Sequence, residues 1–281
     1  MKQIVIISGK GGTGKTILTG AFAALAENKV IADCDVDAAD MHLLLKPTVI
    51  KKGIFKSGKT AFINKDKCIK CGLCKKLCRY DAIKNREVDA LACEGCAFCS
   101  FACPVGAIEM KENITGEWFV SATRFGILIH AKLGIGEENS GKLVSLVREK
   151  AQKIAKIQNK DLIIIDGPPG IGCPVIASIT GVDCALVVTE PTLSGLVDAK
   201  RVIEVAKHFK VSVKLVINKY DLNKEMTQKI ENYCINNNIL CIGKIPFDEN
   251  VVNAMVQGKT MIEYSTSKTT DIIKNIWKDL K

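Results

Sequence analysis

The sequence has few aromatic residues and no long apolar stretch. Phe, Trp and Tyr make up 5% of its 281 residues, and no apolar run approaches the roughly 20 residues needed to cross a bilayer. The first apolar run, Ile4–Ile7, is too short for the core of a signal peptide. These absences exclude an integral membrane protein, and we expect a cytoplasmic one.

The basic residues form no long cluster. Lys and Arg outnumber Asp and Glu by 40 to 30, a formal net charge of +10, but they are spread along the chain. Nucleic-acid binding is carried mainly by clustered basic charge, so we expect no dedicated nucleic-acid site. The excess charge suits phosphate groups or acidic protein partners instead.

Thirteen cysteines stand beside only three histidines. The cytosol keeps thiols reduced, so a disulfide framework is a poor explanation of this count. The cysteines concentrate in one stretch, where the alternation of strand and helix patterns stops. We therefore predict an α/β domain over residues 1–59 and 112–281, interrupted by an inserted module over residues 60–111.

A glycine-rich loop follows the first predicted strand. It reads GKGGTGKT and fits the pattern G-x-x-x-x-G-K-[ST] between a strand and a helix. Backbone N–H groups of such a loop surround the phosphates of a nucleotide, and the helix N-terminus adds positive potential. In this pattern Lys15 reaches the β- and γ-phosphates, and Thr16 is a Mg²⁺ ligand. The sequence predicts an ATP and Mg²⁺ site formed by Gly9, Lys10, Gly11, Gly12, Thr13, Gly14, Lys15 and Thr16.

The early lysine of this loop, Lys10, makes it resemble the loop of the MinD/ParA/Mrp and nitrogenase iron protein class. The resemblance implies an ATP-dependent homodimer in which Lys10, like Lys15, acts in catalysis, by reaching the partner's nucleotide. It implies that Asp35 positions the attacking water. Asp33 and Asp166 end predicted strands and are candidates to support Mg²⁺. A solvated surface lysine is the alternative for Lys10.

Two later segments are candidates for contacts with adenine. The same resemblance implies that Asn218 reads the base edge and that Pro246, Phe247 and Asp248 lie against the base. A turn-forming asparagine is an equally good interpretation of Asn218. The segment Gly136–Lys142 also matches G-x-x-x-x-G-K, but it lacks the hydroxyl residue and carries two glutamates, so we expect no nucleotide there.

The inserted module repeats one cysteine pattern. C-x₂-C-x₂-C-x₃-C occurs twice, 25 residues apart, and in bacterial ferredoxins the fourth cysteine of this run ligates the other cluster. Zinc is the alternative, although zinc sites usually pair two C-x₂-C knuckles across a longer gap. The pattern predicts two [4Fe–4S] clusters, one held by Cys68, Cys71, Cys74 and Cys103 and the other by Cys93, Cys96, Cys99 and Cys78.

Two features outside these motifs have open interpretations. Cys173 follows the Asp166 strand and faces either a dimer partner or a transferred cluster, unless it is a buried core residue like the other four isolated cysteines. The chain ends in an amphipathic segment with Ile273, Ile276 and Trp277 on one face. Such an ending either packs on its own domain or touches a membrane.

Over nearly its whole length the chain resembles MinD/Mrp-type ATPases that carry an inserted two-cluster ferredoxin. The resemblance implies an α/β P-loop NTPase fold with a mostly parallel sheet flanked by helices, plus a small ferredoxin-like module. Three functions are compatible with it: an ATPase that transfers electrons to a redox partner, a carrier that gives a cluster to an acceptor protein, and a positioning ATPase whose clusters sense redox state. We rank them in that order, because eight ligands within one chain oppose cluster release.

Overall fold

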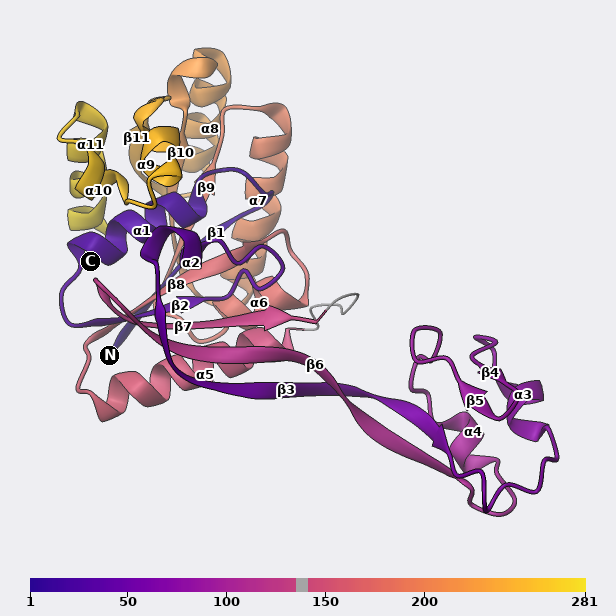
Figure 1. The fold of residues 1–281 in the computed structure, drawn as a ribbon. Coiled ribbons are helices and arrows are strands. Elements are labelled where there is room, and N and C mark those ends of the chain that lie inside the picture. The colour runs from indigo at the N-terminus through magenta and orange to yellow at the C-terminus, as the bar shows by residue number, and fades with distance from the viewer. Residues whose placement is uncertain (135–140) are drawn as a thin grey trace. The chain divides into compact units, whose positions relative to one another are not determined.

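The longest continuous feature of the computed structural model, which describes residues 1–134 and 141–281, is a nine-stranded sheet. Its strand order is β11-β10-β9-β1-β8-β2-β7-β6-β3, and the neighbours from β11 to β7 are parallel (Figure 1). The central strands are nearly continuous apolar runs, as expected of a sheet covered on both faces. The strands are β1 (Lys2–Ser8), β2 (Lys29–Asp33), β3 (Thr48–Ile63), β6 (Ile108–Thr123), β7 (Gly126–Leu133), β8 (Leu162–Pro169), β9 (Cys184–Thr189), β10 (Ser212–Asn218) and β11 (Leu240–Ile245).

The chain divides into two compact units. Unit 1 comprises Met1–Gly53 and Glu117–Lys281, and unit 2 comprises Ile54–Gly116. The long strands β3 and β6 contribute residues to both units. Unit 2 is therefore longer at each end than the insert that we predicted over residues 60–111, because its first and last strands begin and end outside the cysteine-rich stretch.

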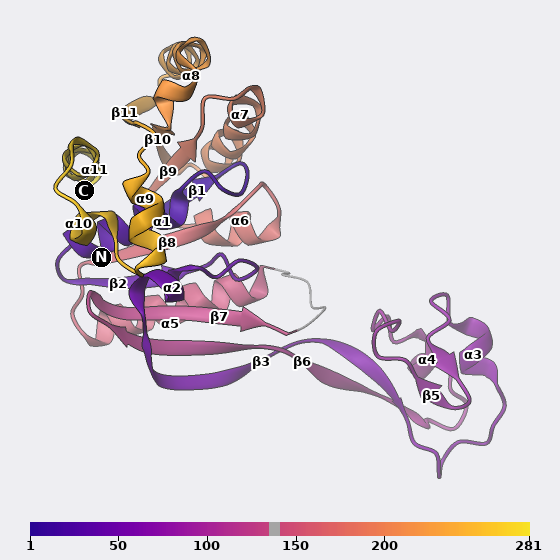
Figure 2. The same cartoon turned by 45° about the horizontal axis from the view of Figure 1, so that its top comes forward.

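Helices cover the sheet of unit 1 (Figure 2). Helices α1, α10 and α11 pack together, and α5 packs against α6 as well as against β2 and β7. Parallel strands need such crossover connections, which is why strand and helix patterns alternate in this part of the sequence. The helices of unit 1 are α1 (Lys15–Leu25), α2 (Met41–Leu45), α5 (Lys142–Ile157), α6 (Cys173–Ile179), α7 (Leu193–His208), the short 3₁₀ helix η1 (Tyr220–Leu222), α8 (Lys224–Asn236), α9 (Asn250–Val256), α10 (Met261–Tyr264) and α11 (Lys268–Leu280).

The apolar face of the last helix is buried in unit 1. The main hydrophobic core includes Ile273, Ile276 and Trp277 of α11. The centroid of the Trp277 ring lies 5.1 Å from that of the Phe22 ring in α1. Packing on its own domain thus accounts for the amphipathic pattern of this helix. In the part of the chain that the structure describes, no helix is long and apolar enough to span a bilayer.

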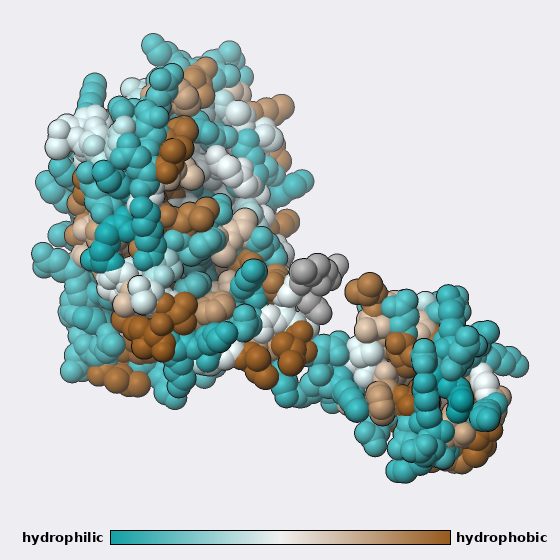
Figure 3. All heavy atoms as spheres, viewed as in Figure 1, coloured by the Kyte–Doolittle hydropathy of each residue, from teal (hydrophilic) through white to brown (hydrophobic). Residues whose placement is uncertain are grey.

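Unit 2 has little regular structure and a small core. Its elements besides parts of β3 and β6 are α3 (Leu73–Leu77), β4 (Ile83–Lys84), β5 (Glu87–Val88) and α4 (Phe98–Phe101). Its buried apolar cluster consists of Ala61, Ile63, Ile83 and Ile108, and six of its eight cysteines pack around that cluster. Large apolar side chains remain at the surface, as the brown patches of Figure 3 show; Leu91 and Phe101 are 91% and 88% exposed.

Candidate nucleotide-binding and cysteine-rich sites

The glycine-rich loop joins β1 to the first turn of α1. Gly14, directly before the helix, has φ 93°, a conformation that strongly favours glycine. Gly9 has no room for a side chain, because a Cβ there would lie 2.3 Å from Cβ of Asp198. The loop backbone therefore lies close to β1 and to α7. The N–H groups of the first turn of α1 lie beside the loop, where this motif is expected to bind phosphate.

Lys15 is held by Asp35. Its ammonium group lies 2.9 Å from Oδ2 of Asp35, and both side chains are about 95% buried. Burial raises the pKa of Asp35, and the charge of Lys15 opposes that rise. The other carboxylate oxygen of Asp35 is buried and has no partner within the described chain. Two residues that the sequence assigned to catalysis are thus in contact, and a phosphate would compete with Asp35 for Lys15.

Three carboxylates, those of Asp33, Asp35 and Asp166, interact with one another near Thr16. Asp166 at the end of β8 accepts hydrogen bonds from Thr16 (2.7 Å) and from Thr19 (2.8 Å). Asp33 lies directly opposite Asp166 in the pairing of β2 with β8. Thr19 was not predicted, although its position one turn after the loop was a signal for it.

Burial and mutual repulsion shift the titration of these acids. Burial raises the pKa of Asp166 to about 6. Burial and then the charge of Asp166 raise the pKa of Asp33 well above its usual range, and Oδ2 of Asp33 has no hydrogen-bond partner in the described residues. Unpaired, crowded carboxylate oxygens next to a threonine hydroxyl are the donor set that Mg²⁺ prefers. These residues fit a magnesium ion that would also bind the phosphates of a nucleotide.

A cavity of about 380 Å³ opens beside the loop. The loop contributes Gly11, Gly12, Gly14, Lys15 and Thr16 to its lining, and Asp35 lies across from them. This volume is within the range of small-molecule sites. The structure therefore brings the loop and the predicted catalytic aspartate to one cavity.

The residues predicted to hold adenine separate into two groups. The side-chain amide of Asn218 donates a hydrogen bond to the Thr13 carbonyl oxygen at 2.8 Å, so Asn218 touches the loop. Pro246, Phe247 and Asp248 do not line the cavity beside the loop. The backbone N–H of Phe247 is instead bound to Asp221, which the sequence reasoning did not single out.

Lys10 pairs within its own chain. Its ammonium group lies 3.3 Å from a carboxylate oxygen of Glu190 and 3.4 Å from the Thr192 hydroxyl. Lys219 binds the same Glu190 at 2.6 Å. The Lys10 side chain is 32% exposed, so it is accessible at the surface. Sequence reasoning missed Glu190, which lies just beyond β9 and carries no motif.

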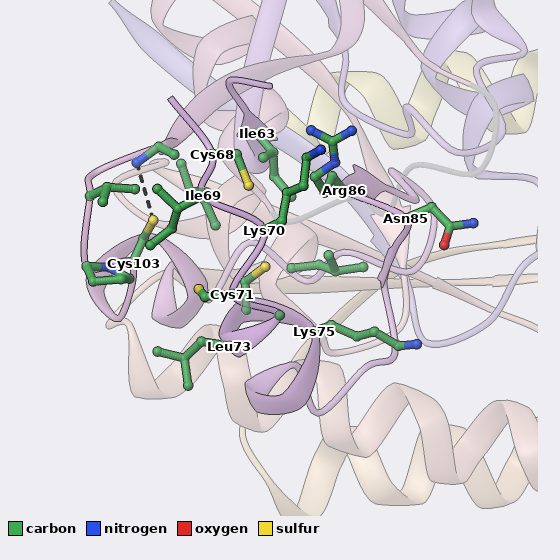
Figure 4. A pocket seen from close by; sticks show the side chains of 17 residues that line it. Ile63, Cys68, Ile69, Lys70, Cys71, Leu73, Lys75, Asn85, Arg86 and Cys103 are labelled. Carbon is green, nitrogen blue, oxygen red and sulfur yellow. Dashed lines mark hydrogen bonds between the residues drawn. The ribbon is translucent and has the colours of Figure 1, made fainter. Parts of the chain in front are cut away.

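The eight cysteines of unit 2 line two cavities. The first, of about 420 Å³, is lined by Cys68, Cys71, Cys74 and Cys103, which we call site 1 (Figure 4). The second, of about 20 Å³, is lined by Cys78, Cys93, Cys96 and Cys99, which we call site 2. Each cavity thus receives three cysteines from one copy of the repeat and the fourth from the other copy.

The thiols within each group influence one another. Burial raises the pKa of Cys74, and its neighbours Cys68 and Cys71 add to that rise. The pKa of Cys99 is raised by burial and by nearby cysteines that include Cys74 of the other site. Each group brings four thiols to one cavity, and the contribution of Cys74 to the pKa of Cys99 shows that the two groups lie close together. Within the described residues, no three His, Cys, Asp or Glu side chains are arranged around a single metal ion.

The remaining cysteines belong to unit 1. Cys34, Cys184 and Cys234 are buried and Cys241 is half-buried, as expected of core residues. Cys173 is exposed at the start of α6, so it is not a core residue. Of the second glycine pattern, Gly136 to Ser140 lie outside the described residues, and Lys142 begins α5.

Comparison with known proteins places this geometry in a family. The family model of the CobQ/CobB/MinD/ParA nucleotide binding domain matches residues 4–261. An uncharacterised protein of Methanocaldococcus jannaschii is 35% identical over 99% of this chain and 96% of its own length. The polyferredoxin protein MvhB of Methanothermobacter marburgensis is 34% identical over 58 residues, which are 20% of this chain and 14% of MvhB.

Solved structures share the fold at low sequence identity. A Cyanothece McdA variant in complex with ATP superposes with a TM-score of 0.63 at 17% identity, over 100% of this chain and 97% of that one. The family match covers the loop, the three carboxylates and most of unit 1. The chain belongs to the CobQ/CobB/MinD/ParA nucleotide-binding family and has its α/β P-loop fold.

Proposed function

We propose that this protein is an ATP-hydrolysing iron–sulfur protein in which the nucleotide state controls electron transfer through two [4Fe–4S] clusters. The observation that carries the proposal is the distribution of the eight cysteines over two cavities, three from one copy of the repeat and one from the other. That exchange of the fourth ligand is typical of two-cluster ferredoxins. The similarity to a polyferredoxin supports the same interpretation.

The cavity of site 1 suits a group much larger than one metal ion. It measures about 420 Å³ and is bounded by Ile63, Ile83 and Ile108 as well as by its four cysteines. An apolar wall limits access of water to a cluster and thereby influences its reduction potential. Site 2 has the same ligand set around about 20 Å³, so its walls would have to move outward on binding. A bound cluster supplies a one-electron carrier at each site.

The nucleotide half of the proposal rests on unit 1. Lys15 would bind the β- and γ-phosphates after leaving Asp35, which would then orient water. Thr16 and Asp166, already joined at 2.7 Å, would hold Mg²⁺ with support from Asp33. For Lys10 to reach the nucleotide of a second copy in a homodimer, it would first leave Glu190, 3.3 Å away. ATP binding would thus exchange two ion pairs within the chain for contacts with phosphate.

A second candidate function is a positioning ATPase that uses its clusters as a redox sensor. The match to the CobQ/CobB/MinD/ParA family favours it. It shares the nucleotide site with the first proposal but requires no electron transfer to a partner. The two differ in whether MgATP changes the properties of the clusters.

Anaerobic purification followed by iron analysis and EPR-monitored redox titration tests the proposal. We expect about eight iron atoms per chain, the content of two [4Fe–4S] clusters, and a potential or line shape that changes when MgATP is added. The Lys15→Ala variant should keep its iron and lose the response to MgATP. An iron-free protein with bound zinc would overturn the cluster assignment. Iron clusters whose potential and line shape do not change with MgATP would favour the positioning ATPase.

A further inference from the structure

The two copies of the cysteine repeat differ in charge. Counting 25 residues forward, Lys70, Lys75 and Lys76 of the first copy correspond to Gly95, Ser100 and Phe101 of the second. Ile69 corresponds to Glu94. The same backbone pattern therefore carries three cations in one copy, and one anion with no cation at these positions in the other.

In the structure, these differing charges lie around the two sites. Lys70, Lys75 and Arg86 line the cavity of site 1, and no acidic side chain is among the described residues around it (Figure 4). Glu94 lines the cavity of site 2, where the described lining contains no basic side chain. Arg86 comes from the turn between β4 and β5 and is half-buried, so its charge is screened less than that of an exposed lysine.

A backbone hydrogen bond adds to the asymmetry. The N–H of Ala107 donates to Sγ of Cys103 in site 1 at 3.3 Å, and hydrogen bonds to cluster sulfurs raise reduction potentials.

The position equivalent to Lys70 has no space for a side chain in the second copy. A Cβ on Gly95 would lie 2.3 Å from the Lys59 carbonyl oxygen. The second copy therefore cannot carry a cation at this position without a backbone shift. The charge difference is built into the packing of unit 2 as well as into its sequence.

We propose that site 1 has the higher reduction potential of the two sites and receives the first electron. The inference rests on the proposed function. A low-potential one-electron donor gives up one electron and is oxidised, and Lys70, Lys75 and Arg86 stabilise the negative charge added at site 1. Glu94 disfavours the same charge at site 2, so a second donor molecule is needed to reduce that site. Electrons that enter at site 2 would move to site 1.

Redox titration of charge variants in the full-length protein tests this order. Lys70→Gln and Arg86→Gln should each lower the higher of the two potentials and leave the lower one in place. Glu94→Gln should raise the lower potential only. Lys56→Gln is a matched control, because Lys56 also belongs to unit 2 but pairs with Glu112 at 3.6 Å and lines neither cavity; it should shift neither potential.

Each reduction potential is assigned to a site by the charge variants that shift it. If Arg86→Gln or Lys70→Gln moved the lower potential, or if Glu94→Gln moved the higher one, the proposed order would be wrong. Two clusters with equal potentials in the wild-type protein would also overturn it. Iron analysis of every variant separates this result from a failure of the cluster assignment itself, since that failure leaves no cluster signal to titrate.

Discussion

The core of unit 1 combines helices from several parts of the chain with a buried sheet. Phe22 of α1 and Trp277 of α11 pack over central strands whose apolar residues are inaccessible to water. Unit 2 buries six apolar residues, three alanines and three isoleucines, of which four form one packed cluster, and it leaves Leu91 and Phe101 exposed. Apolar burial therefore suffices for one unit and is scarce in the other.

The comparison shows where ligand binding contributes to folding. Small units rarely bury enough apolar surface to be stable alone, and many of them use metal centres or disulfides. Six of the eight cysteines of unit 2 pack around its four-residue core. If these cysteines bind clusters, the binding free energy also stabilises the fold of unit 2.

If unit 2 binds the proposed clusters, the largest expected effect is its unfolding when the iron is removed. An iron chelator under oxidising conditions should unfold Ile54–Gly116 and leave unit 1 folded, because the ligand sites and the small core coincide. Limited proteolysis followed by mass spectrometry should find new cleavages within unit 2 alone. Protection of unit 2 in the iron-free protein would mean that its four-residue core is sufficient.

The reverse effect is expected from a cavity in the core of unit 1. Phe22→Ala should reduce the free energy of unfolding by about 3–5 kcal/mol, the usual cost of removing a buried phenylalanine side chain. Thermal unfolding followed by circular dichroism measures this loss. The absorbance of the clusters proposed for unit 2 should be unchanged at temperatures where unit 1 remains folded. A loss of this absorbance in parallel with the destabilisation by Phe22→Ala would show that the units fold together.

Nucleotide binding by unit 1 should depend strongly on one lysine. Lys15→Ala should weaken MgATP binding by about 100-fold, since a hydrogen bond from a charged group contributes up to about 3 kcal/mol. Isothermal titration calorimetry measures the affinity.

Lys142→Ala is the matched control, because Lys142 occupies the same place in the second glycine pattern and begins α5. Its affinity for MgATP should equal that of the wild type. A loss of binding in this variant would contradict the assignment of that segment.

A smaller, pH-dependent effect is expected at an ion pair of unit 1. Glu263 caps α10 through Thr260 and accepts two hydrogen bonds from Arg124, at 2.6 and 2.8 Å. The Arg124 hydrogen bond lowers the pKa of Glu263 to about 2. Because the folded pKa lies below the unfolded value, this stabilisation is complete above about pH 4.5 and is lost as the pH falls toward 2.

Glu263→Gln should therefore cost about 1–2 kcal/mol near neutral pH and almost nothing near pH 2. Urea unfolding at several pH values measures the difference. The exposed pair of Glu225 with Lys229 on α8 provides the control, and Glu225→Gln should change the unfolding midpoint less. A cost that does not depend on pH would point to lost packing instead of lost charge.

Local motifs were readable from the sequence because their chemistry depends on neighbours along the chain. The loop from Gly9 to Thr16 needs a strand before it and a helix after it, and the structure has both. The α/β P-loop fold was predicted on the same grounds and is confirmed. The C-x₂-C-x₂-C-x₃-C spacing likewise predicted which cysteines group together, and the iron that they would bind stays a prediction.

Contacts between distant segments were decided by the tertiary structure. Asp33 and Asp166 meet because β2 pairs with β8 in a register that places them opposite each other, and no local pattern encodes that register. The partners of Lys10 and Lys15, Glu190 and Asp35, follow from strand order in the same way. Sequence alone determined which groups could do chemistry here, and the pairing of parallel strands, stabilised by burial of their apolar faces, decided which of those groups lie within reach of one another.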